Sequence, residues 1–217
     1  MALMALGAVA SASQALAQEV VAPDAAEPVS DDAVHFAKWV SASGDNRGLP
    51  FIVIDKIAAA VFVYDRTGLS LGTTPALLGV AQGDDTVPGI GDREMSAVRP
   101  HERTTPAGRF LARIGPAIGH RKVLWVDYGS SIALHPIVPG TKRERRAQRL
   151  KSPSSRDNRI TYGCINVSAA FYENVIRTLY GNDSGVVYIL PETKPLSEVF
   201  PTFRAPEQPS LQTSFGR

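Results

Sequence analysis

The chain has 217 residues, of which 44% are hydrophobic and 20% are charged, and its formal net charge is +2. This length is enough for one sizeable buried core and hardly enough for two. A net charge so close to zero gives no indication of a nucleic-acid partner, so we do not expect that class of function.

The first seventeen residues predict an export signal. They read MALMALGAVASASQALA, carry no charge, and place an A-x-A site after an apolar run. The run is too short and too rich in Ala and Ser to span a membrane, where about twenty apolar residues are needed. No basic region precedes the run, and the alternative is an Ala-rich disordered leader. We expect residues 1–17 to be a signal peptide and the mature protein to be periplasmic, without a stable membrane span.

Residues 18–49 are expected to form a flexible lead-in with one short helix. The segment QEVVAPDAAEPVSDD is acidic and rich in Pro and Ala, a composition typical of unpacked chain. The segment DDAVHFAKWV then predicts a helix that is capped by one of its two leading aspartates. Its apolar side is expected to consist of Val34, Ala37 and Val40.

From Pro50 the sequence indicates β-structure. Short β-branched or aromatic runs follow one another: FIVID, AAVFVYD, PALLGVA, RFLARI, KVLWVDYG, SSIALHPI and, later, GVVYILP. Turn signals such as DRTG and GPAIGH separate them. Strands this closely spaced favour hairpins and a mostly antiparallel sheet. We expect one domain over residues 50–193, followed by a loosely ordered Pro-rich tail over 194–217.

A basic insertion at residues 140–160 interrupts this pattern. Between residues 142 and 159 there are eight basic and two acidic residues, so the local charge is +6 in a chain whose total is +2. A capping box from Thr141 to Glu144 predicts a short helix here. The positive charge is thus concentrated in the segment that leads to Cys164.

Cys164 is the only cysteine, and it lies in RITYGCINVS. An exported lone thiol is either a buried small hydrophobe or a reactive group. Gly163 allows close backbone approach, and N–H groups near Gly163 and Cys164 are suited to stabilising an oxyanion. The best helical pattern of the chain follows, SAAFYENVIRTLYGN, with Ser168 as its cap. The N-terminus of such a helix would favour a thiolate modestly. A thiol with a pKa near 8.5 still needs a base at neutral pH.

Four histidines are candidates for that base. Three are most simply surface residues: His35, His101 and His120. His135 differs, because the alternation of SSIALHPI places it on the strand face opposite Ile132 and Leu134. Pro136 follows, which indicates a strand end or sheet edge. An isolated strand histidine is usually structural, but together with the lone cysteine it predicts a Cys–His dyad.

The order of these residues resembles the YkuD-type L,D-transpeptidase catalytic domain. His135, a gap, and TYGCIN at residues 161–166 are similar to the family pattern His, gap, [Ser/Thr]-x-Gly-Cys-[Ile/Val]-[Arg/Asn]. PFIVIDKIAAAVFVYD resembles the opening hairpin of the family, and ERTTPAGRF resembles its Thr-Pro-x-Gly segment. The resemblance covers roughly residues 50–192. It implies a mainly β fold with short helices, a mixed-sheet β-sandwich with a helix after the catalytic cysteine.

Two departures from the family pattern stand out. Tyr162 replaces the usual histidine two residues before the cysteine, and 29 positions separate His135 from Cys164, a long gap caused by the basic insertion. In the family the upstream histidine pairs with the cysteine, so the loss of the other histidine leaves the dyad intact. Tyr162 either donates a hydrogen bond as a partial replacement or only packs.

The resemblance implies attack on peptidoglycan stem peptides, at the bond between the third residue, usually diaminopimelate, and D-alanine. Cys164 would form a thioester, His135 would handle the protons, and the N–H groups of Gly163 and Cys164 would hold the oxyanion. The acceptor is an amine in a transpeptidase and water in a carboxypeptidase or cross-link hydrolase. No cofactor and no metal is implied. The rival hypothesis is a catalytically silent domain that binds cell-wall peptide.

Arginines provide candidates for binding the carboxylates of a stem peptide. Arg159 is the first choice because it is the arginine nearest in sequence to the thiol, and Thr161, Tyr162 and Asn166 are further tentative substrate-binding residues. The insertion adds Arg143, Arg145, Arg146 and Arg149. These side chains are expected either to steer anionic groups or to form a solvated basic helix that binds nothing in particular.

A serine hydrolase is a weaker alternative. GLSLG at residues 68–72 matches G-x-S-x-G, but that motif requires a strand, a sharp turn and then a helix. Here Thr73, Thr74 and Pro75 stand where the helix would begin, so a hairpin is expected instead.

Overall fold

The computed structural model describes residues 30–118, 121–138, 140, 142–181 and 183–203. The expected signal peptide, the beginning of the lead-in, His120, Thr141 and the end of the Pro-rich tail lie outside the described residues. In the described part of the chain no helix is long and apolar enough to cross a membrane.

The strands form one large mixed sheet and one small sheet. The order in the large sheet is β3-β2-β1-β10-β5-β6-β7-β9, and β4 pairs with β8. The bounds are β1 Phe51–Asp55, β2 Ala60–Tyr64, β3 Ser70–Pro75, β4 Leu78–Gly79, β5 Gly108–Pro116, β6 Lys122–Asp127, β7 Ile132–Pro136, β8 Arg159–Thr161, β9 Ile165–Val167 and β10 Gly185–Ile189. The pairs β1–β10, β7–β9 and β4–β8 are parallel, and the others are antiparallel. The predicted mainly β, mixed-sheet fold is therefore confirmed.

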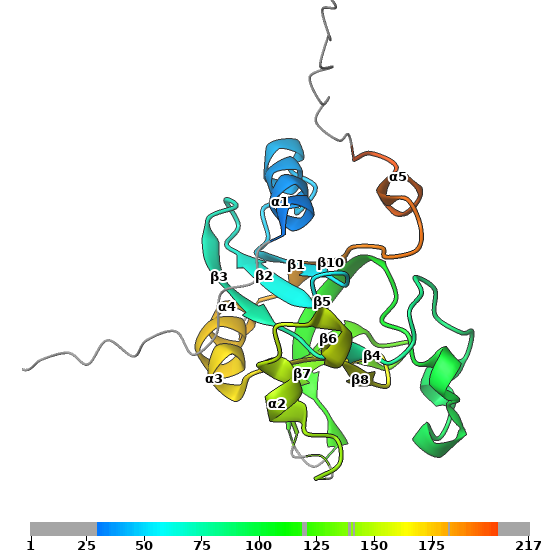
Figure 1. Ribbon diagram of the computed structural model, residues 1–217. Helices are drawn as coiled ribbons and strands as arrows, with labels where there is room; N and C mark the ends of the chain where they lie inside the picture. Colours follow the sequence, from blue (N-terminus) through cyan, green and yellow to red (C-terminus); the bar gives the residue numbers. More distant parts are fainter. Residues whose placement is uncertain (1–29, 119–120, 139, 141, 182, 204–217) are drawn as a thin grey trace, which may run out of the picture.

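Strand β5 joins the two halves of the large sheet. Its residues 108–112 pair with β10, and its residues 113–116 pair with β6. Apolar side chains from both halves, among them Ile54, Leu124 and Leu134, meet in one core. The sheet thus folds over itself into the predicted sandwich, and the second half carries β7 and β9 (Figure 1).

Two helices cover the outer face of β1, β2 and β10 (Figure 1). Helix α1 spans Asp31–Ser43, and helix α5 spans Leu196–Val199. The cap of α1 is Ser30, whose side chain accepts a hydrogen bond from Ala33 N, so the predicted aspartate cap is wrong. The predicted apolar side is corrected as well, because Phe36 is fully buried while Val34 is 37% exposed.

The packing of α1 and α5 bears on the expected domain bounds. Both helices contribute to the second core, although α1 lies in the expected flexible lead-in, 18–49, and α5 in the expected tail, 194–217. The outer face of β1 and β10 carries apolar residues such as Phe51 and Tyr188, and burying them needs a cover. The described parts of both segments therefore pack on the domain expected over 50–193.

The helix after the cysteine forms as predicted, with an irregular middle. Ser168 caps it by accepting a hydrogen bond from Phe171 N. The segments are α3 Ala169–Phe171, a π-helical turn Tyr172–Ile176, and α4 Arg177–Tyr180. Because β9 lies between Cys164 and this helix, the thiol does not sit at the helix N-terminus.

Short elements complete the chain. Helix α2 spans Arg146–Leu150, and 3₁₀ turns span Ile90–Asp92, Met95–Ala97, Pro100–Glu102 and Ser155–Asn158. The basic helix therefore begins later than the sequence predicts, after Arg145, whose φ is +45°. The segment that contains GLSLG continues into strand β3, which confirms the hairpin over the serine elbow.

Candidate active site

The turn that carries Cys164 lies between β8 and β9 and needs a glycine. Gly163 has φ +123°, and a Cβ at this position would lie 2.6 Å from Thr104 O. Only a residue without a side chain fits both the conformation and the close approach. The close backbone approach predicted for Gly163 is therefore confirmed, and the neighbouring backbone is that of Thr104.

Two threonine hydroxyls hold the turn. Thr161 Oγ1 accepts a hydrogen bond from Gly163 N at 3.1 Å and donates one to Cys164 O at 2.6 Å. Thr105 is fully buried, and its Oγ1 donates to Gly163 O at 2.8 Å and accepts from Gly79 N at 2.9 Å. Because Gly163 N–H is bound to Thr161, it is not available to an oxyanion in this arrangement. Thr161 therefore holds the turn, is itself only 2% exposed, and has its hydroxyl proton committed to Cys164 O.

The Cys164 thiol lies against the backbone of β7. Its Sγ is 3.6 Å from Ser131 O, and the sulfur also receives the Ala133 N–H. Burial raises the pKa of the thiol, although Ala133 N–H and the charge of Arg146 act in the opposite direction. At neutral pH the group at rest is therefore a thiol, and it needs a base to become a nucleophile.

Strand register brings His135 into the same region. His135 pairs with Asn166 in the parallel β7–β9 ladder, and Leu134 pairs with Ile165. Leu134 points into the core while His135 is half-buried on the other face, as the alternation predicts. His135 follows Ala133 by two positions, about 7 Å along the strand from the backbone that contacts the thiol.

Hydrogen bonds fix the protonation of the His135 ring. Nδ1 lies 2.9 Å from Pro136 O, and Nε2 lies 3.1 Å from Asn166 Nδ2. A carbonyl oxygen only accepts, so Nδ1 carries the proton and Nε2 accepts from the amide. Burial lowers the pKa of His135, and the charges of Arg146 and Arg121 lower it further. The ring is thus a neutral base with its lone pair on Nε2.

The dyad is not closed in this structure. No hydrogen bond joins the two described side chains of His135 and Cys164, because Nε2 is bound to Asn166 instead. Cys164 and His135 therefore come from the turn before β9 and from its paired strand β7, and Nε2 has to leave the Asn166 amide before it can take the thiol proton.

Arg146 extends this network into the basic insertion. Its NH1 donates to Asn166 Oδ1 at 2.9 Å, and its Nε donates to Glu144 Oε2 at 2.9 Å. Asn166 is only 1% exposed, and its backbone also bonds Leu77 in both directions. Asn166 consequently orients His135 in this structure, because one N–H of its side-chain amide goes to the His135 ring and the amide oxygen accepts from Arg146.

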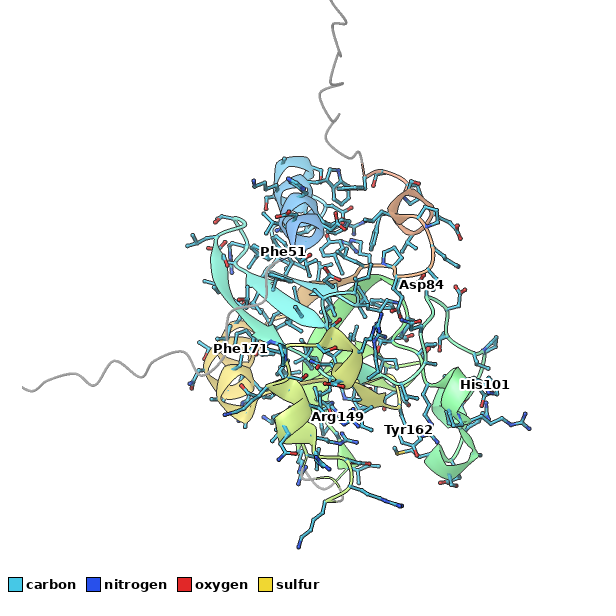
Figure 2. The ribbon with its side chains drawn as sticks, in the orientation of Figure 1. Phe51, Asp84, His101, Arg149, Tyr162 and Phe171 are labelled. Carbon is cyan, nitrogen blue, oxygen red and sulfur yellow. The ribbon has the colours of Figure 1, made fainter. Side chains whose placement is uncertain are left out.

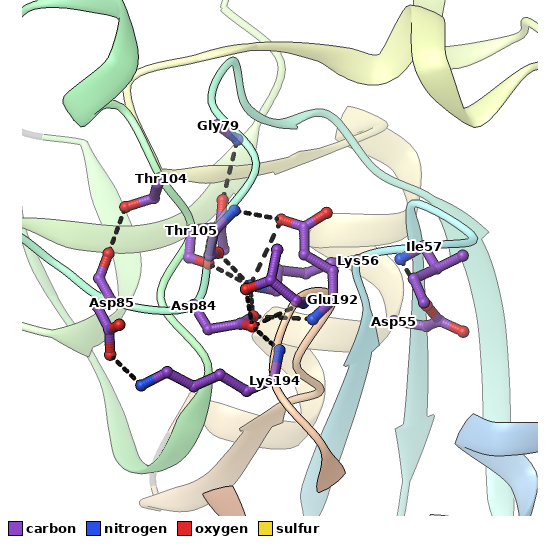
Figure 3. A network of polar contacts seen from close by, with 12 residues as sticks. Asp55, Lys56, Ile57, Gly79, Asp84, Asp85, Thr104, Thr105, Glu192 and Lys194 are labelled. Atoms are coloured by element: carbon purple, nitrogen blue, oxygen red, sulfur yellow. Dashed lines mark hydrogen bonds and ion pairs between the residues drawn. The ribbon is translucent and has the colours of Figure 1, made fainter. Parts of the chain in front are cut away.

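Arg159 belongs to a buried ion cluster. Its guanidinium pairs with the Glu192 carboxylate and donates to Lys56 O at 2.7 Å, and its side chain is only 12% exposed. Lys56 in turn pairs with Asp84 at 2.6 Å (Figure 3). Arg159 was expected to bind a substrate carboxylate. Its guanidinium already binds the carboxylate of Glu192, so this arrangement does not favour that role.

Tyr162 packs against an arginine. The guanidinium of Arg103 lies 3.8 Å from the centre of the Tyr162 ring. Figure 2 shows Tyr162 between the sheet and the segment that carries His101, two residues before Arg103. Of the two expected roles for Tyr162, packing is the one seen here, because its hydroxyl bonds no other described residue.

The remaining arginines of the insertion lie around α2. Arg143, Arg145 and Arg149 line an open hollow of about 460 Å³ together with Gln148, Ser152 and Asp157. Arg149 is bound to two carbonyl oxygens, those of Glu144 and Asp157. Only Arg146 reaches from this segment to the Asn166–His135 network.

Sequence reasoning missed three contributors to the site. Ser131 supplies the carbonyl next to the thiol, Arg103 covers Tyr162, and the Thr105 hydroxyl holds the turn. The Thr-Pro-x-Gly resemblance pointed to the region of Thr105 without giving it a role. Among the described residues no group of three or more His, Cys, Asp or Glu side chains is placed to hold a metal ion.

Comparisons with known proteins give weak likenesses. No family model and no curated protein matches the chain. An L,D-transpeptidase from Mycobacterium smegmatis is 17% identical, with a TM-score of 0.36 over 64% of this chain and 58% of that chain. An L,D-transpeptidase from Xylanimonas cellulosilytica is 16% identical, with a TM-score of 0.39 over 65% and 60%. The helical cell shape determining protein Pgp2 from Campylobacter jejuni is 14% identical, with a TM-score of 0.44 over 76% and 58%.

The match spans about three fifths of the length of each of these three proteins, 58–60%. At identities of 14–17% and TM-scores below 0.5, the comparisons do not assign a family or an activity. The function has to be argued from the residues at the site.

Proposed function

We propose that the chain is a cysteine-dependent acyl transferase of the L,D-transpeptidase type that acts on peptidoglycan stem peptides. Cys164 is the nucleophile and His135 is the base. The observation that carries the proposal is the neutral His135 ring. Its proton is held on Nδ1 by Pro136 O, and its Nε2 lone pair accepts from Asn166, which lies in β9 two residues after Cys164.

In the first half-reaction the thiol proton moves to His135 Nε2 while Sγ attacks the carbonyl carbon between the third stem residue and D-alanine. The Asn166 amide gives up Nε2 to allow this transfer. The C–N bond then breaks, the Nε2 proton passes to the leaving amine, and a thioester to Cys164 remains. In the second half an amine or water attacks the thioester, gives a proton to Nε2, and the proton returns to the thiolate.

The two pKa directions fit this sequence of steps. Burial keeps Cys164 as a thiol and His135 as a neutral ring at rest, so the proton moves during the attack and no thiolate–imidazolium pair forms beforehand. For the oxyanion the proposal keeps the Cys164 N–H as a donor. It omits the Gly163 N–H, which is bound to Thr161.

The site of action follows from the substrate. Stem peptides lie outside the cytoplasm, so the proposal includes export through residues 1–17 and a periplasmic mature protein. A single cysteine suits an oxidising compartment only if the thiol has a use or is protected.

Purified disaccharide-tetrapeptide tests the proposal. Release of D-alanine, absent in Cys164→Ser and strongly slowed in His135→Asn, is the expected result. Mass spectrometry of the products identifies the acceptor: a cross-linked dimer indicates transpeptidation, a tripeptide indicates carboxypeptidase activity, and cleavage of preformed dimers indicates cross-link hydrolysis.

A catalytically silent peptide-binding domain is the second candidate. The bond between His135 Nε2 and Asn166 favours it, because the base is occupied, and Tyr162 stands where the family has a histidine. Binding of the tetrapeptide without D-alanine release, at any pH between about 6 and 9, would select this candidate over the enzyme.

A further inference from the structure

Arg103 is a half-buried cation beside the cysteine turn, and it pairs with no acid among the described residues. It belongs to the segment 103–105, which packs directly on the turn: Thr104 O lies where a Gly163 side chain would be, and Thr105 Oγ1 bonds Gly163 O. The guanidinium stacks on Tyr162, two residues before Cys164. Two residues of extended chain span at most about 7 Å, so the residue on which the cation stacks is close to Cys164 along the turn.

The partners of Arg103 leave its charge uncompensated. Its Nε and NH2 both donate to one carbonyl oxygen, Val98 O, at 3.1 and 2.8 Å. Within the described chain no carboxylate lies within ion-pair distance of it, although the neighbouring Arg93 pairs with Glu102 at 2.9 Å. A guanidinium has five N–H donors in a planar fork, and the two bonds to Val98 O leave three of them, both on NH1 and one on NH2, for another acceptor.

Two other arginines near the site each have a carboxylate partner. Arg159 pairs with Glu192, and Arg146 pairs with Glu144. Stacking on an aromatic face and anchoring to a carbonyl hold the Arg103 plane in one orientation, which reduces the entropy lost when it binds an anion. A planar anion that matches the fork is a carboxylate.

We propose that Arg103, held by Tyr162, binds a carboxylate of the donor stem peptide and so sets which stems the site accepts. This assignment rests on the proposed function and adds its substrate specificity. It also gives Tyr162 a role: the ring is the platform that positions the cation. Two carboxylates belong to the residues on either side of the bond that is cut, the side-chain carboxylate of the third residue and the C-terminal carboxylate of D-alanine, and these are the two sources that the proposal considers.

The test compares wild type, Arg103→Gln and Arg103→Lys on four synthetic tetrapeptide stems: unmodified, amidated on the third side chain, amidated at the C-terminus, and amidated at both. On the unmodified stem Arg103→Gln should lower kcat/KM by about tenfold to hundredfold through KM, and Arg103→Lys should recover part of the loss. Amidation of the carboxylate that Arg103 binds should remove the difference between wild type and Arg103→Gln, and the stem on which it vanishes identifies the source.

Two outcomes would overturn the assignment. Equal kcat/KM for wild type and Arg103→Gln on the unmodified stem would show that the cation binds no carboxylate. An equal loss on all four stems would show that Arg103 only supports the turn.

A second readout separates this inference from the enzyme claim. The stems are titrated calorimetrically into Cys164→Ala and into Cys164→Ala/Arg103→Gln, neither of which can turn over. If Arg103→Gln weakens binding of the unmodified stem but not of an amidated stem, Arg103 binds that carboxylate, even if the wild-type protein releases no D-alanine. If Arg103→Gln weakens binding of all four stems equally, the assignment is wrong.

Discussion

Two polar networks of this molecule lie on either side of Thr105 and differ in kind. Around Lys56 the charges are balanced and enclosed. Lys56 meets Asp84 and Glu192 (Figure 3), Arg159 meets Glu192, and the side chains of the two carboxylates are at most 3% exposed. Lys56 Nζ donates to Gly83 O, Asp84 and Thr105 O, so all its protons are used.

Around Cys164 the reacting groups are neutral and less tightly bound. His135 and Cys164 carry no charge at rest, and Asn166 and Pro136 hold the ring through hydrogen bonds. Structural and functional ionisable groups differ here in their partners. A buried charge that meets its full set of partners has no capacity left, whereas a neutral group whose pKa is shifted mainly by burial keeps its chemistry.

The pKa directions express the same contrast. Burial works to raise the pKa of the Asp84 carboxyl, but hydrogen bonds from Lys56, Thr193 and neighbouring backbone hold it well below its usual range. Burial lowers the pKa of His135, and only one hydrogen bond, to Pro136, opposes this. Asp84 therefore stays charged at any ordinary pH, while His135 remains able to gain and lose a proton.

The largest effect is expected from opening the enclosed cluster. Lys56→Met leaves Asp84 buried without its cation and should lower the free energy of unfolding by about 3–5 kcal/mol. Lys194→Met is the matched control, because Lys194 pairs with the exposed Asp85 at the surface, and it should unfold like wild type. Chemical denaturation measures both, and equal stability of the two variants would refute the contrast.

The next effect comes from the turn that the two networks share. Gly163→Ala combines a positive φ with a Cβ 2.6 Å from Thr104 O and should cost about 3 kcal/mol of stability and most of the activity. Gly44→Ala also has a positive φ, +69°, but meets no atom within 4 Å, so about 1 kcal/mol is expected. Similar losses in urea unfolding would mean that the close approach at Gly163 carries no weight.

A smaller effect should follow from loosening the imidazole. Asn166→Ala removes the donor on His135 Nε2 and the acceptor of Arg146, and we expect kcat to fall about tenfold to hundredfold with KM little changed. Asn158→Ala is the control: this equally buried asparagine bonds Ala76 O outside the site and should lower stability but leave kcat unchanged. A rise in kcat of Asn166→Ala would indicate that Asn166 restrains the base instead of orienting it.

The smallest effect is a shift in pH dependence. The charge of Arg146 lowers the pKa of His135, so Arg146→Met should raise that pKa. Because the base acts only when neutral, the acid limb of the kcat/KM profile should move to higher pH, by less than about one unit. Arg149→Met, from the same helix, should leave the limb in place. A shift towards lower pH would contradict the sign.

The sequence predicted most of the elements but few of the partners. Runs such as FIVID and GVVYI become β1 and β10 because their apolar residues fit a buried strand, and alternation placed His135 on the correct face. Strands β8 and β9 have only three residues each, too few for a periodic signal, and β8 pairs with the distant β4.

The candidate site could be predicted only as far as residue types allow. The motif singled out Cys164 and His135. Arg159 looked available for a substrate because no local pattern reveals its partner Glu192, which stands 33 positions away. The stacking of Arg103 on Tyr162 is likewise a product of the fold, since 59 positions separate the two residues.

The most direct test of the central claim, that Cys164 is a nucleophile served by His135, is intact-mass detection of an acyl adduct after incubation with a carbapenem at neutral pH. We expect one adduct on the wild-type protein and none on Cys164→Ser. Adduct formation on His135→Asn should be slower by at least about a hundredfold. An unmodified wild-type protein, or an adduct that forms equally fast in His135→Asn, would contradict it.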